Sequence, residues 1–160
     1  MVQFKLRVFL DTNILVDVLC GPERSSYVYS TKIIKGAKDG LFEAFITTQS
    51  IIDAEFICTN SPGSNAAYFY ESMLSMIKYL NIGSIDSMEI KDALLHPDKD
   101  FEDSAQFAHA SSEGMDIIIT SDRKFGNRKK DDGLVFMTPE QFVHRMENEY
   151  LSLRDIQQII

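Results

Sequence analysis

The 160-residue sequence has no tryptophan and only two cysteines, and none of its apolar runs approaches the roughly 20 residues of a membrane-spanning helix. The N-terminus, MVQFKLRVFLD, lacks the apolar segment and cleavage site of a secretory signal. Cys20 and Cys58 lie in apolar helical patterns, and too few other cysteines or histidines cluster with them for a zinc site. We therefore expect a cytoplasmic protein without a membrane partner, in which both cysteines are free, buried thiols.

Basic residues are also scarce, because 16 Lys and Arg face 24 Asp and Glu and the formal net charge is -8. This balance argues against nucleic-acid binding through a broad basic surface. The exception is a protein whose acidic residues gather around metal ions, since the cations reverse the local field. One basic run, RKFGNRKK at 123–130, holds five Lys and Arg. It is either a solvent-exposed loop or a loop that contacts phosphates.

Apolar, β-branched segments alternate with helical patterns along almost the whole chain. Strands are expected at 5–10, 41–48, 80–85, 116–120 and 134–138, and helices at 13–19, 26–38, 49–60, 66–80, 87–96, 100–114 and 139–150. The strands are apolar on both faces, as buried parallel strands are. This order predicts an α/β/α sandwich around a parallel sheet of about five strands. We expect one domain at 1–150 and an apolar C-terminal tail at 151–160.

Four aspartates occur near the carboxyl ends of the expected strands. Asp11 follows the first strand, Asp53 lies in the helix after the second, Asp103 in the helix before the fourth, and Asp122 follows the fourth. Each has an ordinary explanation alone, such as a helix N-cap, a favourable charge near a helix N-terminus, or an exposed position.

Taken together, these carboxylates share no ordinary explanation. The carboxyl ends of parallel strands meet at one edge of the sheet, where ligands bind in such folds. Carboxylates that converge there without Lys or Arg between them repel one another if desolvated, and either protonation or a bound cation relieves this. Oxygen ligands of this kind suit Mg²⁺ or Mn²⁺.

Four segments in a fixed order carry a resemblance to a known family: FLDTNILVDVL, TTQSIIDAEFI, DFEDSAQFAHASSEGMDIIITSDRKF and VFMTPEQFV. The sequence resembles the PIN-domain proteins, metal-dependent nucleases that include the toxins of many bacterial toxin–antitoxin pairs. The resemblance runs from about Phe4 to Val143. It extends to a subgroup whose third acid is written D-F-E-D, and it implies a PIN-like, Rossmann-like fold.

The resemblance also implies a set of catalytic and metal-binding residues. Asp11, Asp103 and Asp122 match the first, third and fourth acids of the family, and Asp53 matches the second by its distance from FITT. Glu55 competes for the second position, but it lies about 200° round a helix from Asp53, so the two cannot both face the site. The local pattern favours Asp53.

Further residues match positions around those acids. Asn13 and Thr120 match residues that support the acids or the phosphate by hydrogen bonds, and Glu102 is a candidate accessory acid. Arg123, Lys124 and Arg128 are candidates for substrate binding.

The implied activity is Mg²⁺- or Mn²⁺-dependent hydrolysis of RNA phosphodiester bonds by an endoribonuclease, leaving a 5′-phosphate and a 3′-hydroxyl. Whether one or two metal ions bind stays open. The implied partners are RNA, an antitoxin protein and a second copy of the chain in a homodimer.

Three alternatives stay open. The first is a catalytically inactive PIN domain that binds RNA or a protein. The second is a receiver-like phosphorylation domain, although the fifth strand, VFMTPE, lacks the lysine that such a domain needs. The third is a serine or cysteine hydrolase, although His96, His109 and His144 accompany no G-x-S-x-G motif.

Overall fold

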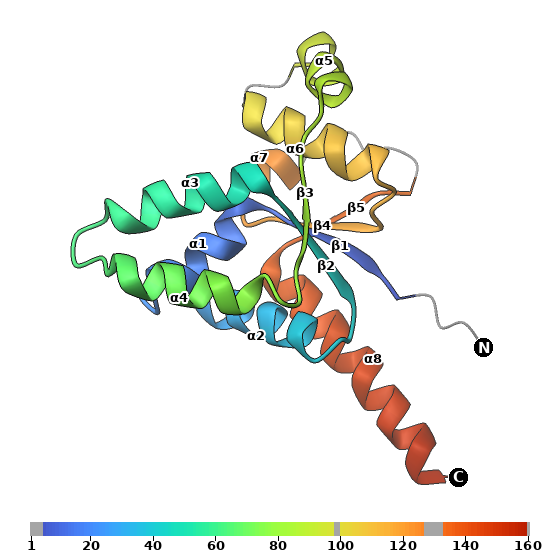
Figure 1. Ribbon diagram of the computed structural model, residues 1–160. Coiled ribbons are helices and arrows are strands. Elements are labelled where there is room, and N and C mark those ends of the chain that lie inside the picture. The colour runs from blue at the N-terminus through green and yellow to red at the C-terminus, as the bar shows by residue number, and fades with distance from the viewer. Residues whose placement is uncertain (1–4, 98–99, 127–132, 160) are drawn as a thin grey trace.

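A computed structural model describes residues 5–97, 100–126 and 133–159, and it contains a five-stranded parallel sheet (Figure 1). The strands are β1 (Arg7–Leu10), β2 (Glu43–Thr47), β3 (Asn81–Gly83), β4 (Ile117–Ile119) and β5 (Val135–Met137). Their order across the sheet is β3-β2-β1-β4-β5, and every neighbouring pair is parallel. The predicted α/β fold with about five parallel strands is confirmed.

The central strand, β1, determines where a ligand site can form. Val8, Phe9 and Leu10 are fully buried, and β1 pairs with β2 on one side and with β4 on the other. The chain passes from β1 outward to β3 in one direction and then returns to build β4 and β5 in the other. The connection that leaves β1 therefore runs toward β2, and the connection that leaves β4 runs toward β5, so the two diverge between β1 and β4. In open α/β sheets, ligands bind at the carboxyl ends of the strands at such a point.

Helices cover both faces of the sheet (Figure 1). The larger hydrophobic core lies between the sheet and α1 (Thr12–Cys20), α2 (Tyr27–Lys38), α3 (Thr48–Thr59), α4 (Ala66–Met76) and α8 (Pro139–Ile159). The smaller core lies on the other face, where α6 (Phe101–Ser112) and α7 (Arg123–Gly126) pack, and α5 (Ser87–Leu95) packs against α6. Figure 1 shows α3 and α4 as an antiparallel pair that extends away from the sheet.

Two helical elements differ from the expected boundaries. The start of the basic run, expected as a loop, forms the helix α7. Helix α8 continues to Ile159, beyond the expected end at Tyr150. The segment LSLRDIQQI contains no glycine or proline to end a helix, which accounts for the longer α8. The division into a domain at 1–150 and a tail stays a prediction.

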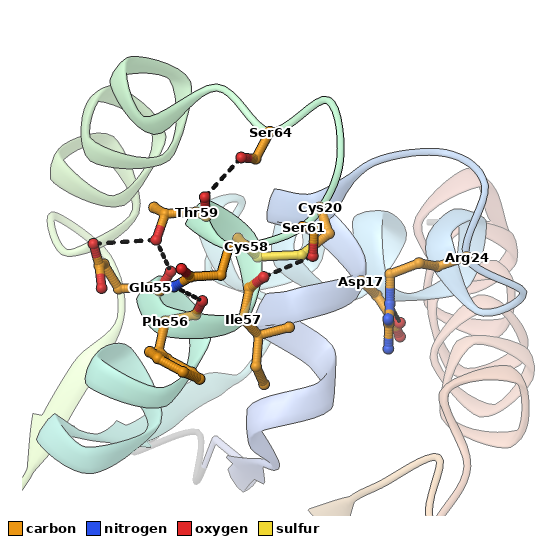
Figure 2. The surroundings of a disulfide bond; sticks show 11 residues. Asp17, Cys20, Arg24, Glu55, Phe56, Ile57, Cys58, Thr59, Ser61 and Ser64 are labelled. Carbon is orange, nitrogen blue, oxygen red and sulfur yellow. Dashed lines mark hydrogen bonds and ion pairs between the residues drawn. A yellow bond between two sulfur atoms is a disulfide. The ribbon is translucent and has the colours of Figure 1, made fainter.

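The expectation of two free thiols is wrong, because Cys20 and Cys58 form a disulfide (Figure 2). Cys20 is the last residue of α1 and Cys58 lies in the last turn of α3, and these two helices pack against each other. Their Cα atoms are 5.2 Å apart, a separation that a disulfide normally spans. The pairing removes the cysteine-based argument for a reducing compartment, so the cytoplasmic location stays a prediction.

Within the described part of the chain, none of the helices is both long enough and apolar enough to cross a membrane.

Candidate active site

Asp11 lies where β1 ends and α1 begins, and its side chain does not act as a helix cap. It occupies the N-cap position of α1, yet in the described structure its carboxylate accepts no capping hydrogen bond from a backbone N–H of the helix. Only 3% of Asp11 is exposed. Its Oδ2 instead accepts hydrogen bonds from Thr120 Oγ1 at 2.8 Å and from Asn13 Nδ2 at 3.3 Å. Helix capping therefore does not explain why a buried strand ends on this carboxylate.

Thr120 connects the carboxyl ends of β1 and β4. Its hydroxyl donates to Asp11 and accepts a hydrogen bond from the backbone N–H of Asp122 at 3.0 Å. Asp122 Oδ1 in turn accepts from the backbone N–H of Lys124 at 2.8 Å, at the start of α7. One buried threonine thus fixes the first acid and the turn that carries the last one, at the point where the connections diverge.

Asp103 completes the acidic cluster from α6. Burial raises its pKa from 3.8 to about 7, and the charges of Asp11, Asp100, Asp122 and Glu102 add to the rise. Burial likewise raises the pKa of Asp11 to about 6; the hydrogen bond from Thr120 opposes this rise and the charge of Glu102 adds to it. Asp103 therefore lies close enough to Asp11 and to Asp122 for their charges to repel its own. Among the described residues, none of the three forms an ion pair with a lysine or arginine.

Asp53 and Glu55 face different neighbours. Asp53 Oδ1 accepts a hydrogen bond from Gln49 Nε2 at 2.8 Å, and the charge of Asp53 raises the pKa of Glu102. Glu55 Oε1 instead accepts from the Tyr70 hydroxyl of α4 at 2.8 Å. The arrangement brings Asp53 beside the acidic cluster through Glu102 and turns Glu55 toward α4.

A polar network around Glu102 was not foreseen from the sequence beyond Glu102 itself. The Thr12 hydroxyl lies 3.1 Å from both Ser50 Oγ and Glu102 Oε1. Gln106 Nε2 donates to Glu102 Oε1 at 2.9 Å and to Thr12 Oγ1 at 3.3 Å. These bonds join α1, α3 and α6 behind the acids. The only signal in the sequence was the four-residue spacing of Glu102 and Gln106 on one helix.

Burial raises the pKa of Glu102, the Thr12 hydroxyl opposes the rise, and the charge of Asp53 adds to it. Glu102 therefore belongs to the same crowded set of carboxylates as the predicted acids, and it links Asp53 to Asp11 and Asp103.

The basic candidates lie next to Asp122. Arg123 and Lys124 are exposed on α7. Arg123 also lines a hollow of about 290 Å³ together with Thr120, Asp122 and Phe136. Arg128, the third candidate for substrate binding, lies outside the described residues.

The donor chemistry of the cluster suits a hard divalent cation. Desolvated carboxylates with pKa values raised to about 6 and about 7 are relieved of their repulsion when a cation binds among them. In the described part of the chain, however, no three acidic, histidine or cysteine side chains are grouped closely enough to hold an ion together. The residues fit a magnesium or manganese ion by chemistry, without forming a closed coordination shell.

Comparisons with known proteins show the family of this chain. Residues 7–124 match the family model of the PIN domain, which is more than half of the chain. The chain belongs to the PIN domain family. The confirmed resemblance covers the family, and the D-F-E-D subgroup stays a prediction.

Individual relatives are distant in sequence. The chain is 22% identical over 142 residues to ribonuclease VapC1 of Aquifex aeolicus (strain VF5). The alignment covers 87% of this chain and 94% of that protein. The toxin VapC20 of Mycobacterium tuberculosis, described as cleaving the sarcin-ricin loop, superposes with a TM-score of 0.59 at 10% identity over 74% of this chain and 92% of that one. A chain of a Klebsiella pneumoniae toxin–antitoxin complex superposes with a TM-score of 0.59 at 14% identity. The match covers 82% of this chain and 97% of that one.

Proposed function

We propose that this protein is a metal-dependent endoribonuclease of the toxin type. The observation that carries the proposal is the buried Asp11 at the divergence point of the sheet, near Asp103 and Asp122, together with the raised pKa values of Asp11 and Asp103. Such an arrangement is unfavourable in a protein that only needs to fold, and it suits one that binds a cation. The likeness to ribonuclease VapC1 supports RNA as the substrate.

Each acid has a defined place in the proposed reaction. Asp11, Asp103 and Asp122 would hold Mg²⁺ or Mn²⁺, with Asp53 joining from α3. A divalent ion bound there would lower the pKa of a bound water and neutralise charge on the phosphate. Thr120 keeps Asp11 oriented, since its hydroxyl donates to the carboxylate at 2.8 Å.

The chemistry is hydrolysis without a nucleophilic side chain. A carboxylate of the cluster accepts a proton as water attacks phosphorus, the bond from phosphorus to the 3′ oxygen breaks, and the leaving oxygen takes a proton from solvent water. The products carry a 5′-phosphate and a 3′-hydroxyl. Arg123 and Lys124 follow the last acid directly and offer the positive charge that holds the RNA backbone.

We extend the proposal to two protein partners. The Klebsiella pneumoniae neighbour comes from a toxin–antitoxin complex, which supports an antitoxin as a partner. The α3–α4 pair exposes large apolar side chains, among them Ile52, Tyr68 and Leu74, and such side chains favour contact with another protein or with a second copy of this chain.

The test is RNA cleavage by the purified chain with Mn²⁺, with Mg²⁺ and with EDTA. The Asp11→Asn, Asp103→Asn double variant is expected to lose cleavage, and the 5′ ends of the products should carry phosphate. Asp116→Asn is the matched control, because Asp116 accepts a hydrogen bond from the Arg7 N–H at the opposite end of the strands. Equal cleavage by the wild type and the double variant would refute the proposed catalytic acids.

The second candidate function is an inactive PIN domain that binds RNA or a protein. The observation that favours it concerns metal ligands: among the described residues, no three acidic, histidine or cysteine side chains are grouped closely enough to hold one metal ion. This candidate predicts no RNA cleavage under any metal condition, with binding of either RNA or a partner protein.

A further inference from the structure

A second hollow borders the acidic cluster on the side of β2 and β3. It has a volume of about 440 Å³ and lies between the first turns of α3, the segment before α5, α5 itself and α6. Asp53 and Glu102 form part of its lining, so it adjoins the carboxylates described above. The hollow beside Asp122 and Arg123 lies toward β4 and β5, so the two hollows flank the acids.

Part of the lining of this second hollow is apolar. Ile85, Ile90 and Phe101 line it, and 44% of Phe101 remains exposed. Phe101 precedes Glu102 and opens α6, so an aromatic ring lies immediately beside the acids. Exposed aromatic side chains beside a nucleic-acid site commonly stack on unpaired bases.

The remaining lining residues are rich in hydrogen-bond acceptors. Asp53 and Glu102 contribute carboxylates, and Gln49 directs its Nε2 to Asp53 Oδ1 at 2.8 Å. Two carboxylates repel a phosphate, so the backbone of RNA is a poor occupant of this hollow. They attract N–H donors, and adenine, cytosine and guanine each carry an exocyclic amino group. Uracil offers only its N3–H, which lies between two carbonyl oxygens that a carboxylate repels.

The volume of the hollow also fits a nucleobase. A volume of about 440 Å³ falls within the range of roughly 300–1,000 Å³ that small-molecule sites occupy, which leaves room for a base and its ribose. The hollow also adjoins the acidic cluster, because Glu102 lines it and is hydrogen-bonded to Thr12, the neighbour of Asp11.

We propose that this hollow binds one unpaired RNA base next to the scissile phosphate, with Phe101 stacking on the base and Glu102 selecting bases that carry an amino group. The inference rests on the proposed ribonuclease function and adds a determinant of sequence preference. Uracil is expected to be the least favoured base at this position.

The first measurement is the nucleotide preference around the cut. Unstructured oligoribonucleotides with randomised positions are cleaved with Mn²⁺, and the new 5′ ends are sequenced. The wild type is expected to disfavour uracil at one position flanking the cut. Phe101→Ala is expected to reduce that preference, and Glu102→Gln to shift it toward uracil, since an amide can donate to a carbonyl oxygen. A merely unfolded or slowed enzyme would not shift the preference.

The second measurement is binding without cleavage, with EDTA and in the Asp11→Asn background. Adding Phe101→Ala is expected to weaken binding of an adenine-containing oligonucleotide about 5- to 100-fold. Phe56→Ala serves as the matched control, because Phe56 is another exposed phenylalanine (66%) that does not line the hollow. Circular dichroism checks that each variant is folded.

The outcomes separate the two proposals. If the wild type cleaves RNA with the same base pattern as Phe101→Ala, the base site is refuted while the ribonuclease stands. If the wild type cleaves no RNA but binds it with a preference that Phe101→Ala abolishes, the base site stands and the catalytic proposal falls. If RNA binding is absent or is unaffected by Phe101→Ala, the base site is refuted in either case.

Discussion

Replacing Asp11 with asparagine is predicted to stabilise the metal-free protein at neutral and alkaline pH. Burial raises the pKa of Asp11 from 3.8 to about 6, so the folded state holds its proton more tightly than the unfolded chain does. The contribution of Asp11 to stability is therefore fully present below pH 4 and is lost as the pH rises through about 6. Above that range the folded protein contains an ionised, desolvated Asp11 carboxylate, which is destabilising. An asparagine at the same position has no such charge.

The magnitude follows from the same shift. A rise from 3.8 to about 6 corresponds to about 3 kcal/mol at full ionisation. Asparagine has the same shape, and its Oδ1 can still accept a hydrogen bond from Thr120. Asp11→Asn is therefore expected to gain up to about 3 kcal/mol at pH 8 and little at pH 4. For a chain of this size the gain at pH 8 corresponds to a Tm increase of about 6–12 °C.

Urea denaturation with EDTA, performed from pH 4 to pH 8 on both proteins with the disulfide oxidised, measures the difference in unfolding free energy. Asp116→Asn is the control, because it makes the same Asp-to-Asn change at the opposite end of the strands. A loss of stability in Asp11→Asn that is equal at pH 4 and pH 8 would refute the reasoning, because Asp11 would then be an ordinary structural acid.

Three further predictions concern positions around the site and the core. Thr120→Val should fold but lower kcat about 10- to 100-fold with Mn²⁺, since Asp11 loses its orienting hydroxyl; unchanged kinetics would count against that role. Cys58→Ser opens a disulfide that closes a sequence separation of 38, and should lower the unfolding free energy in urea by up to about 4 kcal/mol, whereas no change would mean that the thiols do not pair in solution. Gly83→Ala should cost about 1–3 kcal/mol in the same assay, because a Cβ there would lie 2.6 Å from the buried His109 Nε2; a neutral result would show that the ring can move.

Much of the fold could be predicted from local patterns. Runs such as DIIIT have no polar face, and in a chain of alternating strands and helices this indicates a buried parallel sheet. The edge that carries the acids follows from the same order, since Asp11 comes directly after β1 and Asp122 comes three residues after the end of β4. The observation that Asp11 bonds to Thr120 rather than capping α1 needed the three-dimensional arrangement.

Other features depend on contacts between distant segments. The Cys20–Cys58 disulfide arises because α1 and α3 pack with their C-terminal ends together, which neither helical pattern indicates. The distinction between Asp53 and Glu55 depends on Tyr70, which belongs to a different helix. The network of Thr12 with α3 and α6 likewise involves ordinary polar residues that gain significance only when three helices meet.

Mn²⁺ binding as a function of pH tests the central claim, that the uncompensated carboxylates form a cation site. Calorimetry in two buffers of different ionisation enthalpy gives both the affinity and the number of protons released. Because the pKa of Asp103 is raised to about 7 and that of Asp11 to about 6, binding at pH 6 should release about one proton or more, and binding at pH 8.5 almost none. The Asp11→Asn, Asp103→Asn variant should lose the binding. Equal Mn²⁺ affinity in the two proteins, or no proton release at pH 6, would contradict the account.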